Sequence, residues 1–568
     1  MQLTVLDWSI VALTLTLTLT IGFGVSKRSS RSSASFFLAG RNMPWWLLGL
    51  SMVATTFSAD TPNLVTNIVR TNGISGNWIW WSMLITGMLT SFVYARLWRR
   101  LAVTTDVEFY ERRYSGGPAR FLRGFRAIYL GLFFNIMIMA SVTLAAIKIG
   151  TVLFSVSPLA VVTIAGLVTV SFSAAGGFLG VLITDMLLFV LAMTGSICAA
   201  YYAVNHPDIG GLDALLSNTQ VVGKLSVLPD FSNPDQYVPI LLVPLLVQWW
   251  SVWYPGAEPG GGGYIAQRML AAKNEKHAVA ASAFFNFCHY AVRPWPWILV
   301  ALASLVVFPD LNSLAAALPQ VPANIIADDL AYSAMLTFLP PGIMGIVVAS
   351  LVSAYISTIS TSLNWGASYV VNDFYARFIN PNASGRQQVT VGRMVTALLM
   401  VLAGVLALKL ESAMQAFRLL LSIGAGTGLL FLLRWFWSRI NAWSEIAAML
   451  LSFIVSLYFE FGPFVDLLAW EKMVLSVGFT TVGWVVVTLV TPPEEKTTLD
   501  RFNADLALGK GEVKRGMILT LFATLGIYAA LFAVGSMIYG NSVAALALGF
   551  VALVLLMICY RRSVAVME

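Results

Sequence analysis

Residues with hydroxyl side chains cluster inside an otherwise apolar stretch around position 357. Ser357, Thr358 and Thr361 follow Ala354 at intervals of three, four and seven residues. Residues at this spacing share one face of a helix, so the hydroxyls and a carbonyl freed at Ala354 would face one point. Small hard cations prefer such oxygen ligands. A packing face of small residues between two membrane helices has the same pattern, and both interpretations remain open.

A second polar cluster lies in the apolar stretch 44–71, where a run of Ser and Thr leads to Asp60 and then to Pro62. Proline removes a backbone donor and disfavours helix in the residue before it. We therefore predict an unwound segment near residues 55–61, whose free carbonyls could hold a cation. A proline kink satisfied by neighbouring helices is the alternative.

A similar break is predicted in the stretch 238–266, which contains two prolines and five glycines between Pro255 and Gly263. Such a composition cannot form a continuous helix interior. The two breaks lie five apolar segments apart, and paired breaks of this kind indicate an inverted-repeat transporter with its binding site between the repeats. Trp253 and Tyr254, beside the second break, could stack on a sugar ring or belong to an interfacial aromatic belt.

Asp185 and Arg293 also lie inside apolar stretches, where charge is costly. Asp185 is a candidate ion or proton site, with a cap or ion pair near the inner interface as the alternative. Arg293 could pair with a substrate carboxylate or with Asp60. It could equally snorkel to the interface or support a kink.

The composition places these clusters in a membrane. The chain has 568 residues, of which 58% are hydrophobic and 11% charged, whereas about 25% of the residues in soluble proteins are charged. A membrane-spanning helix needs about 20 apolar residues. We expect an all-α membrane protein with about fifteen transmembrane helices, near residues 5–25, 44–71, 77–98, 124–152, 157–175, 179–205, 238–266, 276–308, 326–372, 390–411, 414–436, 442–461, 469–491, 515–538 and 541–560.

The distribution of Lys and Arg predicts the topology. With the N-terminus outside and the C-terminus inside, most of the 34 basic residues lie in the inner connections, and the outer loops hold little beyond Lys224 and Lys472. The positive-inside rule therefore explains the net charge of +7 without a nucleic-acid partner. The three histidines and three cysteines are scattered, which argues against a metal site and against an enzyme.

Four stretches resemble motifs of the sodium/solute symporter family, which includes bacterial sodium-coupled sugar, sialic acid and proline symporters and animal sodium/glucose cotransporters. They are residues 36–46, the Gly-Gly to Thr-Asp stretch 176–185, the Gln-Arg loop 267–273, and the Phe-Trp-Ser-Arg sequence 436–439. The resemblance implies the leucine-transporter fold, a five-plus-five inverted repeat with extra helices, and Na+ as the coupling ion.

On this basis we expect seven parts. They are an extra N-terminal helix with an inner loop (1–43), the first repeat (44–205), an outer loop (206–237), the second repeat (238–440), two additional helices (441–491), a cytoplasmic linker (492–514), and a final helix pair with the tail (515–568).

The resemblance also implies binding residues. The common sodium site would use carbonyls of Ala54, Phe57 and Ala354 and hydroxyls of Ser357 and Thr358. A second sodium site would use Asp185, Ser357, Ser360 and Thr361. The substrate-binding candidates are Ser58, Asp60, Asn135, Trp253, Tyr254, Asn286 and Arg293. Leu188 stands where the family often has Gln, and Asn286 stands where a galactose transporter of the family has Lys. The resemblance therefore does not identify the substrate of this chain.

We therefore expect sodium-coupled symport of a small polar organic solute by alternating access, with two sodium ions. The functional unit would be a monomer spanning the cell inner (plasma) membrane many times. The size of the aromatic cluster favours a sugar or sugar-derived solute. The alternatives are an organic acid or amino acid as solute, a proton-coupled symporter that uses Asp185 or Asp60, and a transport-like sensor.

Overall fold

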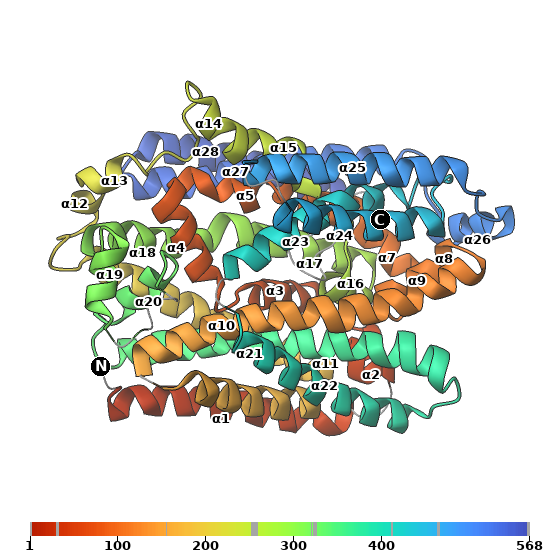
Figure 1. The fold of residues 1–568 in the computed structure, drawn as a ribbon, viewed down its shortest axis with the longest axis horizontal. Helices are drawn as coiled ribbons and strands as arrows, with labels where there is room; N and C mark the ends of the chain where they lie inside the picture. The colour runs from red at the N-terminus through yellow and green to blue at the C-terminus, as the bar shows by residue number, and fades with distance from the viewer. Residues whose placement is uncertain are drawn as a thin grey trace.

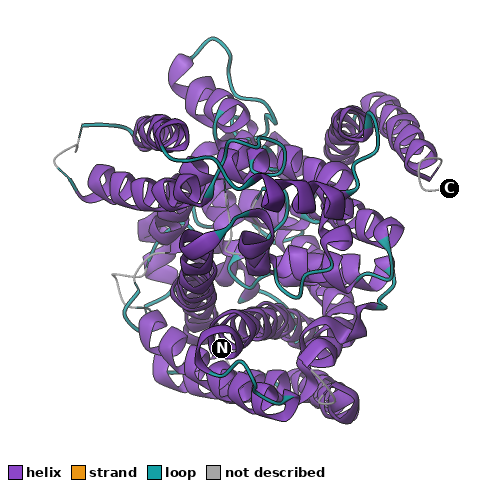
Figure 2. Ribbon diagram, turned by 90° about the vertical axis from the view of Figure 1, so that its right-hand side faces the viewer, coloured by secondary structure: helices purple, strands orange, loops and turns teal. Residues whose placement is uncertain are grey.

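The computed structural model describes residues 3–564 except 30–32, 155, 252–258, 320, 322–325, 411–412 and 463–465. Throughout the described ranges the regular elements are helices, and strand-like pairing is limited to one bridge between Met43 and Ala272 (Figure 2). Many of the long helices run along the long axis of the molecule (Figure 1).

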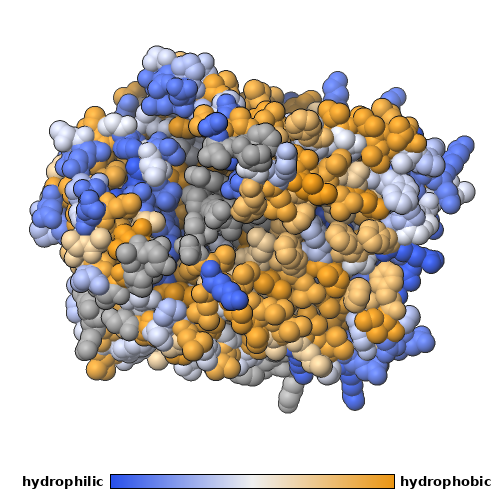
Figure 3. All heavy atoms as spheres, in the orientation of Figure 1, coloured by the Kyte–Doolittle hydropathy of each residue, from blue (hydrophilic) through white to orange (hydrophobic). Residues whose placement is uncertain are grey.

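An apolar band covers the middle of the face drawn in Figure 3, and hydrophilic residues gather towards its two ends. This pattern fits a protein surrounded by lipid. Ten described helical stretches are long and apolar enough to cross a membrane: Ile74–Leu101, Gly116–Phe154, Gly177–Val204, Glu275–Val307, Ile343–Ile379, Gly385–Ala407, Ala442–Phe461, Ala469–Val490, Glu512–Ile538 and Ser542–Ser563. The all-α membrane class is thus confirmed, whereas the count of fifteen is not.

The N-terminal half contains the first predicted break. Its elements are α1 (Val5–Ser29), α2 (Ser33–Leu38), η1 (Ala39–Arg41), α3 (Trp45–Thr56), α4 (Thr61–Asn72), η2 (Ile74–Asn77), α5 (Trp78–Trp81), α6 (Leu84–Leu89), η3 (Thr90–Tyr94), α7 (Ala95–Leu101), η4 (Asp106–Glu108), α8 (Phe109–Arg113), α9 (Gly116–Ile128), η5 (Tyr129–Phe134), α10 (Asn135–Phe154) and α11 (Pro158–Val204). Helix α3 ends at Thr56 and α4 begins at Thr61 with Pro62 in its first turn. The break expected at residues 55–61 is confirmed.

The second predicted break is present at residues 259–262, whereas residues 255–258 of it lie outside the described residues. The elements from the outer loop to the second long helix are α12 (Leu212–Ser217), α13 (Thr219–Val222), α14 (Pro234–Tyr237), η6 (Val238–Leu242), α15 (Val243–Leu246), η7 (Gln248–Trp250), α16 (Gly263–Ala271), α17 (Glu275–Phe287), η8 (Cys288–Val292) and α18 (Pro294–Val307). Between η7 and α16 the described residues are not helical. The Trp250 Nε1 and Ser251 hydroxyl groups donate to the carbonyls of Ala425 (3.1 Å) and Leu421 (2.7 Å) of α23, which anchors the end of η7.

The remaining helices are α19 (Leu311–Ala317), α20 (Leu330–Leu336), α21 (Ile343–Ser368), η10 (Tyr369–Ile379), α22 (Gly385–Ala407), α23 (Ala413–Leu433), α24 (Ala442–Phe461), α25 (Ala469–Val490), α26 (Lys496–Leu506), α27 (Glu512–Ile538) and α28 (Ser542–Val564). The stretch 326–372, expected to be one helix, is divided, because two prolines precede Gly342, which has a φ of +85°. The expected linker 492–514 contains α26, whose Phe502 packs against Phe109 and Trp435.

Three helices surround the centre of the bundle. Helix α21 packs along α11, and both contact α3 just before its break. A change of direction at Gly177, with a φ of +55°, divides α11 ahead of Asp185. The polar residues of α3, α11 and α21 are therefore brought to one point.

Candidate ion- and solute-binding site

The end of α3 and the hydroxyl run of α21 meet at the first break. The Thr358 hydroxyl donates to the carbonyl of Thr55 at 2.8 Å. The Phe57 N–H group donates to the carbonyls of Val53 (2.9 Å) and Ala54 (3.1 Å), which closes the last turn of α3. All five residues predicted for the common sodium site (Ala54, Phe57, Ala354, Ser357 and Thr358) are buried. The described geometry thus places Thr358 beside the carbonyl end of a broken helix.

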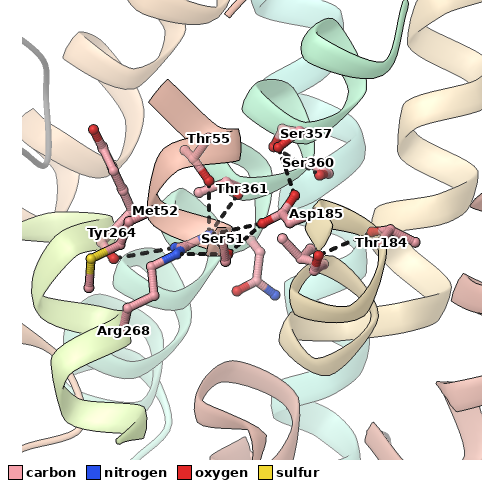
Figure 4. A network of polar contacts seen from close by, with 12 residues as sticks. Ser51, Met52, Thr55, Thr184, Asp185, Tyr264, Arg268, Ser357, Ser360 and Thr361 are labelled. Carbon is pink, nitrogen blue, oxygen red and sulfur yellow. Dashed lines mark hydrogen bonds and ion pairs between the residues drawn. The ribbon is translucent and has the colours of Figure 1, made fainter. Parts of the chain in front are cut away.

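Asp185 lies on the other side of the same hydroxyl run. Its carboxylate accepts hydrogen bonds from Ser357 (2.7 Å) on α21 and from Ser51 (2.5 Å) on α3 (Figure 4). The aspartate side chain is fully buried. Asp185 therefore joins three helices, and Ser357 faces it rather than the break in α3.

Arg268 fills the space beside Asp185. Its guanidinium group donates to the hydroxyls of Ser51 (2.9 Å), Thr55 (3.0 Å) and Thr361 (3.0 Å) and lies 3.6 Å from the Asp185 carboxylate (Figure 4). The sequence resemblance predicts residues 267–273 as a loop, which is wrong for Arg268. It belongs to the buried helix α16, and its side chain is as inaccessible as that of Asp185.

The residues predicted for the second sodium site converge, but their hydroxyls have other partners. The Thr361 hydroxyl lies 3.1 Å from the Thr55 hydroxyl, and it accepts a hydrogen bond from Arg268. The Ser360 hydroxyl donates to the Ser357 carbonyl at 3.1 Å, one turn back in its own helix. The arginine thus supplies the positive charge that balances the Asp185 carboxylate, with Ser51 bridging the two groups.

Arg293 is buried beside the end of α3, with only 2% of its surface exposed. It donates to the Thr56 hydroxyl at 3.0 Å, and its guanidinium lies 3.3 Å from His289, which itself lies 3.1 Å from Thr56. Among the described residues it has no ion pair with Asp60. The alternative in which Arg293 snorkels is wrong, and so is its direct pairing with Asp60.

Asn286 lines a small cavity between α6, η3, α16 and α17. Thr86, Thr90, Ser282 and Tyr290 supply the other polar groups of its wall. The cavity volume is about 30 Å³, which is room for about one water molecule and too little for a hexose. A β-carbon at Gly87 would lie 1.9 Å from the Asn286 side-chain oxygen, so a larger residue there would displace the Asn286 side chain.

The other substrate candidates are dispersed. Asn135 donates to the Ser362 carbonyl at 2.8 Å and thereby joins α10 to α21. Ser58 and Asp60 lie in the break after α3. Trp253 and Tyr254 lie outside the described residues.

Ion pairs join the helices at both ends of the bundle. At one end Arg70 pairs with Asp328 (2.7 Å) and Lys148 with Asp329 (2.8 Å). At the other end Glu111 accepts from Arg377 and Arg123. Burial would raise the pKa of Glu111, but the hydrogen bonds and charges of these two arginines outweigh it and hold the pKa below its usual value. These pairs therefore join the described helices at both ends of the bundle.

Sequence reasoning missed four members of the site: Ser51, Thr55, Arg268 and His289. Ser51 and Thr55 are four residues apart, so their shared helical face was a usable signal. Arg268 gave no local signal, because a basic residue near the end of an apolar segment is ordinarily an interfacial one.

Residues 36–452 match the model of the family described as "Sodium:solute symporter family". The chain is 26% identical to the sodium/glucose cotransporter of Vibrio parahaemolyticus, over 86% of this chain and 91% of that protein. It is also 26% identical to the sodium/myo-inositol cotransporter 2 of Oryctolagus cuniculus, over 79% of this chain and 69% of that protein.

Among solved structures, the chain resembles a Na+-coupled sialic acid symporter in a substrate-bound outward-open state. The TM-score is 0.70 at 20% sequence identity, covering 87% of this chain and 99% of that one. The likeness shows the fold, which is the leucine-transporter fold.

The Asp185–Arg268 pair should be energetically coupled. Removing one partner of a buried pair leaves an uncompensated charge and costs about 3–5 kcal/mol. We expect Asp185→Asn and Arg268→Gln each to lower the thermal unfolding temperature of the purified protein in sodium-free buffer, and the double variant to lose much less than the sum. Tryptophan fluorescence during heating measures the effect.

Arg112→Gln is the matched control, because Arg112 forms a half-exposed pair with Glu108, and such surface pairs contribute about 0–1 kcal/mol. Additive losses in the double variant would show that the two buried groups do not compensate one another.

Proposed function

Because this chain belongs to the Sodium:solute symporter family, we propose that it couples the uptake of a neutral sugar or sugar-derived solute to two sodium ions. Membership makes it a multi-pass, sodium-coupled solute transporter and not an enzyme, and Na+ is its coupling ion. The solute and the number of ions are the proposal.

The first sodium ion would bind at the break in α3. The contact between the Thr358 hydroxyl and the carbonyl of Thr55 at 2.8 Å is the observation that carries the proposal. It places a side-chain oxygen beside the Thr55 carbonyl at the end of α3, and oxygens of both kinds suit a hard cation. The carbonyls of Ala54, Phe57 and Ala354 would complete the ligand set, together with the Ser357 hydroxyl once it turns from Asp185.

The second sodium ion would bind at Asp185 with Ser357, Ser360 and Thr361. Arg268 already neutralises this carboxylate, and a second positive charge beside it would be costly in a buried site. We therefore infer that the guanidinium withdraws from Thr361 and Ser51 when sodium enters. The proton-coupled alternative would place a proton on Asp185 or Asp60 instead.

A neutral solute suits the polar groups around the small cavity that Asn286 lines. Thr86, Thr90, Ser282, Asn286 and Tyr290 supply uncharged donors and acceptors. The nearby cation, Arg293, is engaged by Thr56 and His289. The named relatives carry glucose and myo-inositol, while the structural neighbour carries sialic acid. We favour a neutral sugar or polyol over an organic acid or amino acid.

The cavity of about 30 Å³ must enlarge before such a solute can bind. We propose that the ion pairs at the two ends open alternately, Arg70–Asp328 at one end and Arg123–Glu111 at the other. We also propose a monomer in the plasma membrane with the N-terminus outside and the C-terminus inside, so that most basic connections face the cytoplasm. The five-plus-five division at 44–205 and 238–440 remains part of this proposal.

Uptake into liposomes tests the function. Purified protein in potassium-loaded vesicles should accumulate labelled glucose, galactose or myo-inositol when sodium, but not choline, is added outside at fixed pH. Sialic acid and proline test the acidic and amino-acid alternatives. Uptake driven by a pH gradient without sodium would contradict sodium coupling, and solute binding with no flux would favour the sensor.

The common sodium site can be tested on α21. Ser357→Ala with Thr358→Ala removes two of its five proposed oxygens, so we expect the sodium concentration for half-maximal uptake to rise on the order of tenfold or more. Ser353→Ala is the matched control, because Ser353 is a buried serine one turn earlier whose hydroxyl makes no hydrogen bond to the described residues. Unchanged sodium dependence in the double variant would rule out this site.

The second sodium ion predicts cooperative sodium dependence. We expect a Hill coefficient near two for uptake, and Asp185→Asn should lower it towards one with much of the solute affinity retained. Thr184→Ala is the control, because the Thr184 hydroxyl donates only to carbonyls of its own helix, at Gly180 and Val181. A coefficient of one in the unmodified protein at saturating solute would contradict cooperative binding of two ions.

A further inference from the structure

A basic cavity lies where α27 begins and α28 ends. Its volume is about 270 Å³, and its walls contain Lys514, Arg515 and Arg562, together with Ile518 and Leu519. The two helices pack side by side, and Figure 2 places the C-terminus at the outer edge of the bundle. The cavity therefore combines three cationic side chains with an apolar floor at the rim of the molecule.

These cationic groups have no compensating acids among the residues that the structure describes. Glu512, the nearest acid in sequence, is engaged by Arg100 at 2.9 Å and by Arg96 at 3.7 Å. Lys514, Arg515 and Arg562 form no ion pair within the described ranges. A neighbouring cavity of about 530 Å³ shares Arg515 and adds Lys276 and Lys510, while the two acids in its wall, Glu275 and Glu512, both pair with Arg100. The two cavities together thus have unbalanced positive charge.

Apolar side chains continue from this cavity along both helices. On α27 the exposed Ile518, Leu521 and Leu525 lie on the helix face of Lys514, and on α28 the exposed Val551 lies on the face of Arg562. In a membrane protein such residues face acyl chains. A ligand that fits both features has an anionic head and apolar tails, whereas a free inorganic anion would use only the head position.

We propose that this cavity binds an anionic phospholipid, with its phosphate between Lys514, Arg515 and Arg562 and its acyl chains along α27 and α28. Basic pockets between transmembrane helices bind anionic headgroups, and each Lys or Arg near the surface contributes about 1 kcal/mol. The lipid would lie in the membrane leaflet on the side where the basic connections between the helices lie.

The lipid would act on the transport core through α27. The Thr520 hydroxyl donates to the Met88 carbonyl (3.3 Å), and the Tyr528 hydroxyl donates to the Trp81 carbonyl (2.8 Å). Gly516 allows this approach, because a β-carbon there would lie 2.8 Å from the Phe92 carbonyl oxygen. Since α27 packs directly on α6 and η3, a lipid that holds its first turn stabilises the whole bundle.

Native mass spectrometry and thermal unfolding of the full-length protein in detergent test the proposal. Phosphatidylglycerol should remain bound and raise the unfolding temperature, whereas phosphatidylcholine with the same acyl chains and inorganic phosphate should not. Lys514→Gln, Arg515→Gln and Arg562→Gln together should weaken phosphatidylglycerol binding at least about tenfold. Arg562→Gln alone should give a smaller loss of phosphatidylglycerol binding. Because Arg562 lies on the exposed end of α28, this single variant replaces the triple variant if the triple variant does not fold.

The matched control replaces three exposed basic residues from other connections, Arg120→Gln, Arg386→Gln and Lys496→Gln, and should bind phosphatidylglycerol like the unmodified protein. Equal losses in both triple variants would show a general charge effect and overturn the site. Equal protection by inorganic phosphate would make it a free-anion site, and equal binding of phosphatidylcholine would also overturn the proposal.

Discussion

The buried pair of Asp185 and Arg268 is the interaction on which the centre of this transporter depends. A lone carboxylate in the middle of a membrane protein is costly, and the guanidinium removes that cost. Because the two groups come from α11 and α16 and share the Ser51 hydroxyl of α3, the pair also fixes the positions of both broken segments. Thr361 adds α21 to the same contact. The geometry of the hydroxyls around the break therefore follows from one electrostatic requirement.

The same pair separates two kinds of cation position. Thr358 donates to the backbone carbonyl of Thr55, so a cation there would be held by uncharged oxygens. Ser357 donates to the Asp185 carboxylate and Thr361 accepts from Arg268, which balances that charge, so a cation there must displace the arginine. Two neighbouring sets of hydroxyls on one helix thus differ in kind, although their residue types are alike.

Local sequence rules predicted the breaks but not their partners. Pro62 predicts one broken helix, and the glycines before residue 264 predict the other. The spacing from Ala354 to Thr361 predicts a polar helix face. The role of Arg268 depends on where α16 packs after a break, which no local pattern contains. For the same reason Arg293 was matched to Asp60, the acid at the break, whereas the fold gives it Thr56 and His289. Packing of α26 through Phe502 was likewise hidden, because its polar composition resembles that of a free linker.

A fixed arginine also changes how voltage acts on the proposed cycle. A membrane potential of 100 mV contributes about 2.3 kcal/mol for each charge that crosses it. If Asp185 returned unpaired, the empty transporter would carry a negative charge through the membrane and voltage would act on that step. With Arg268 seated, the empty site is neutral and the return step moves no net charge at this position. The membrane potential then acts only on the steps in which sodium is bound. Arg268, which competes with the second sodium ion, therefore also limits the effect of voltage to ion binding and inward movement.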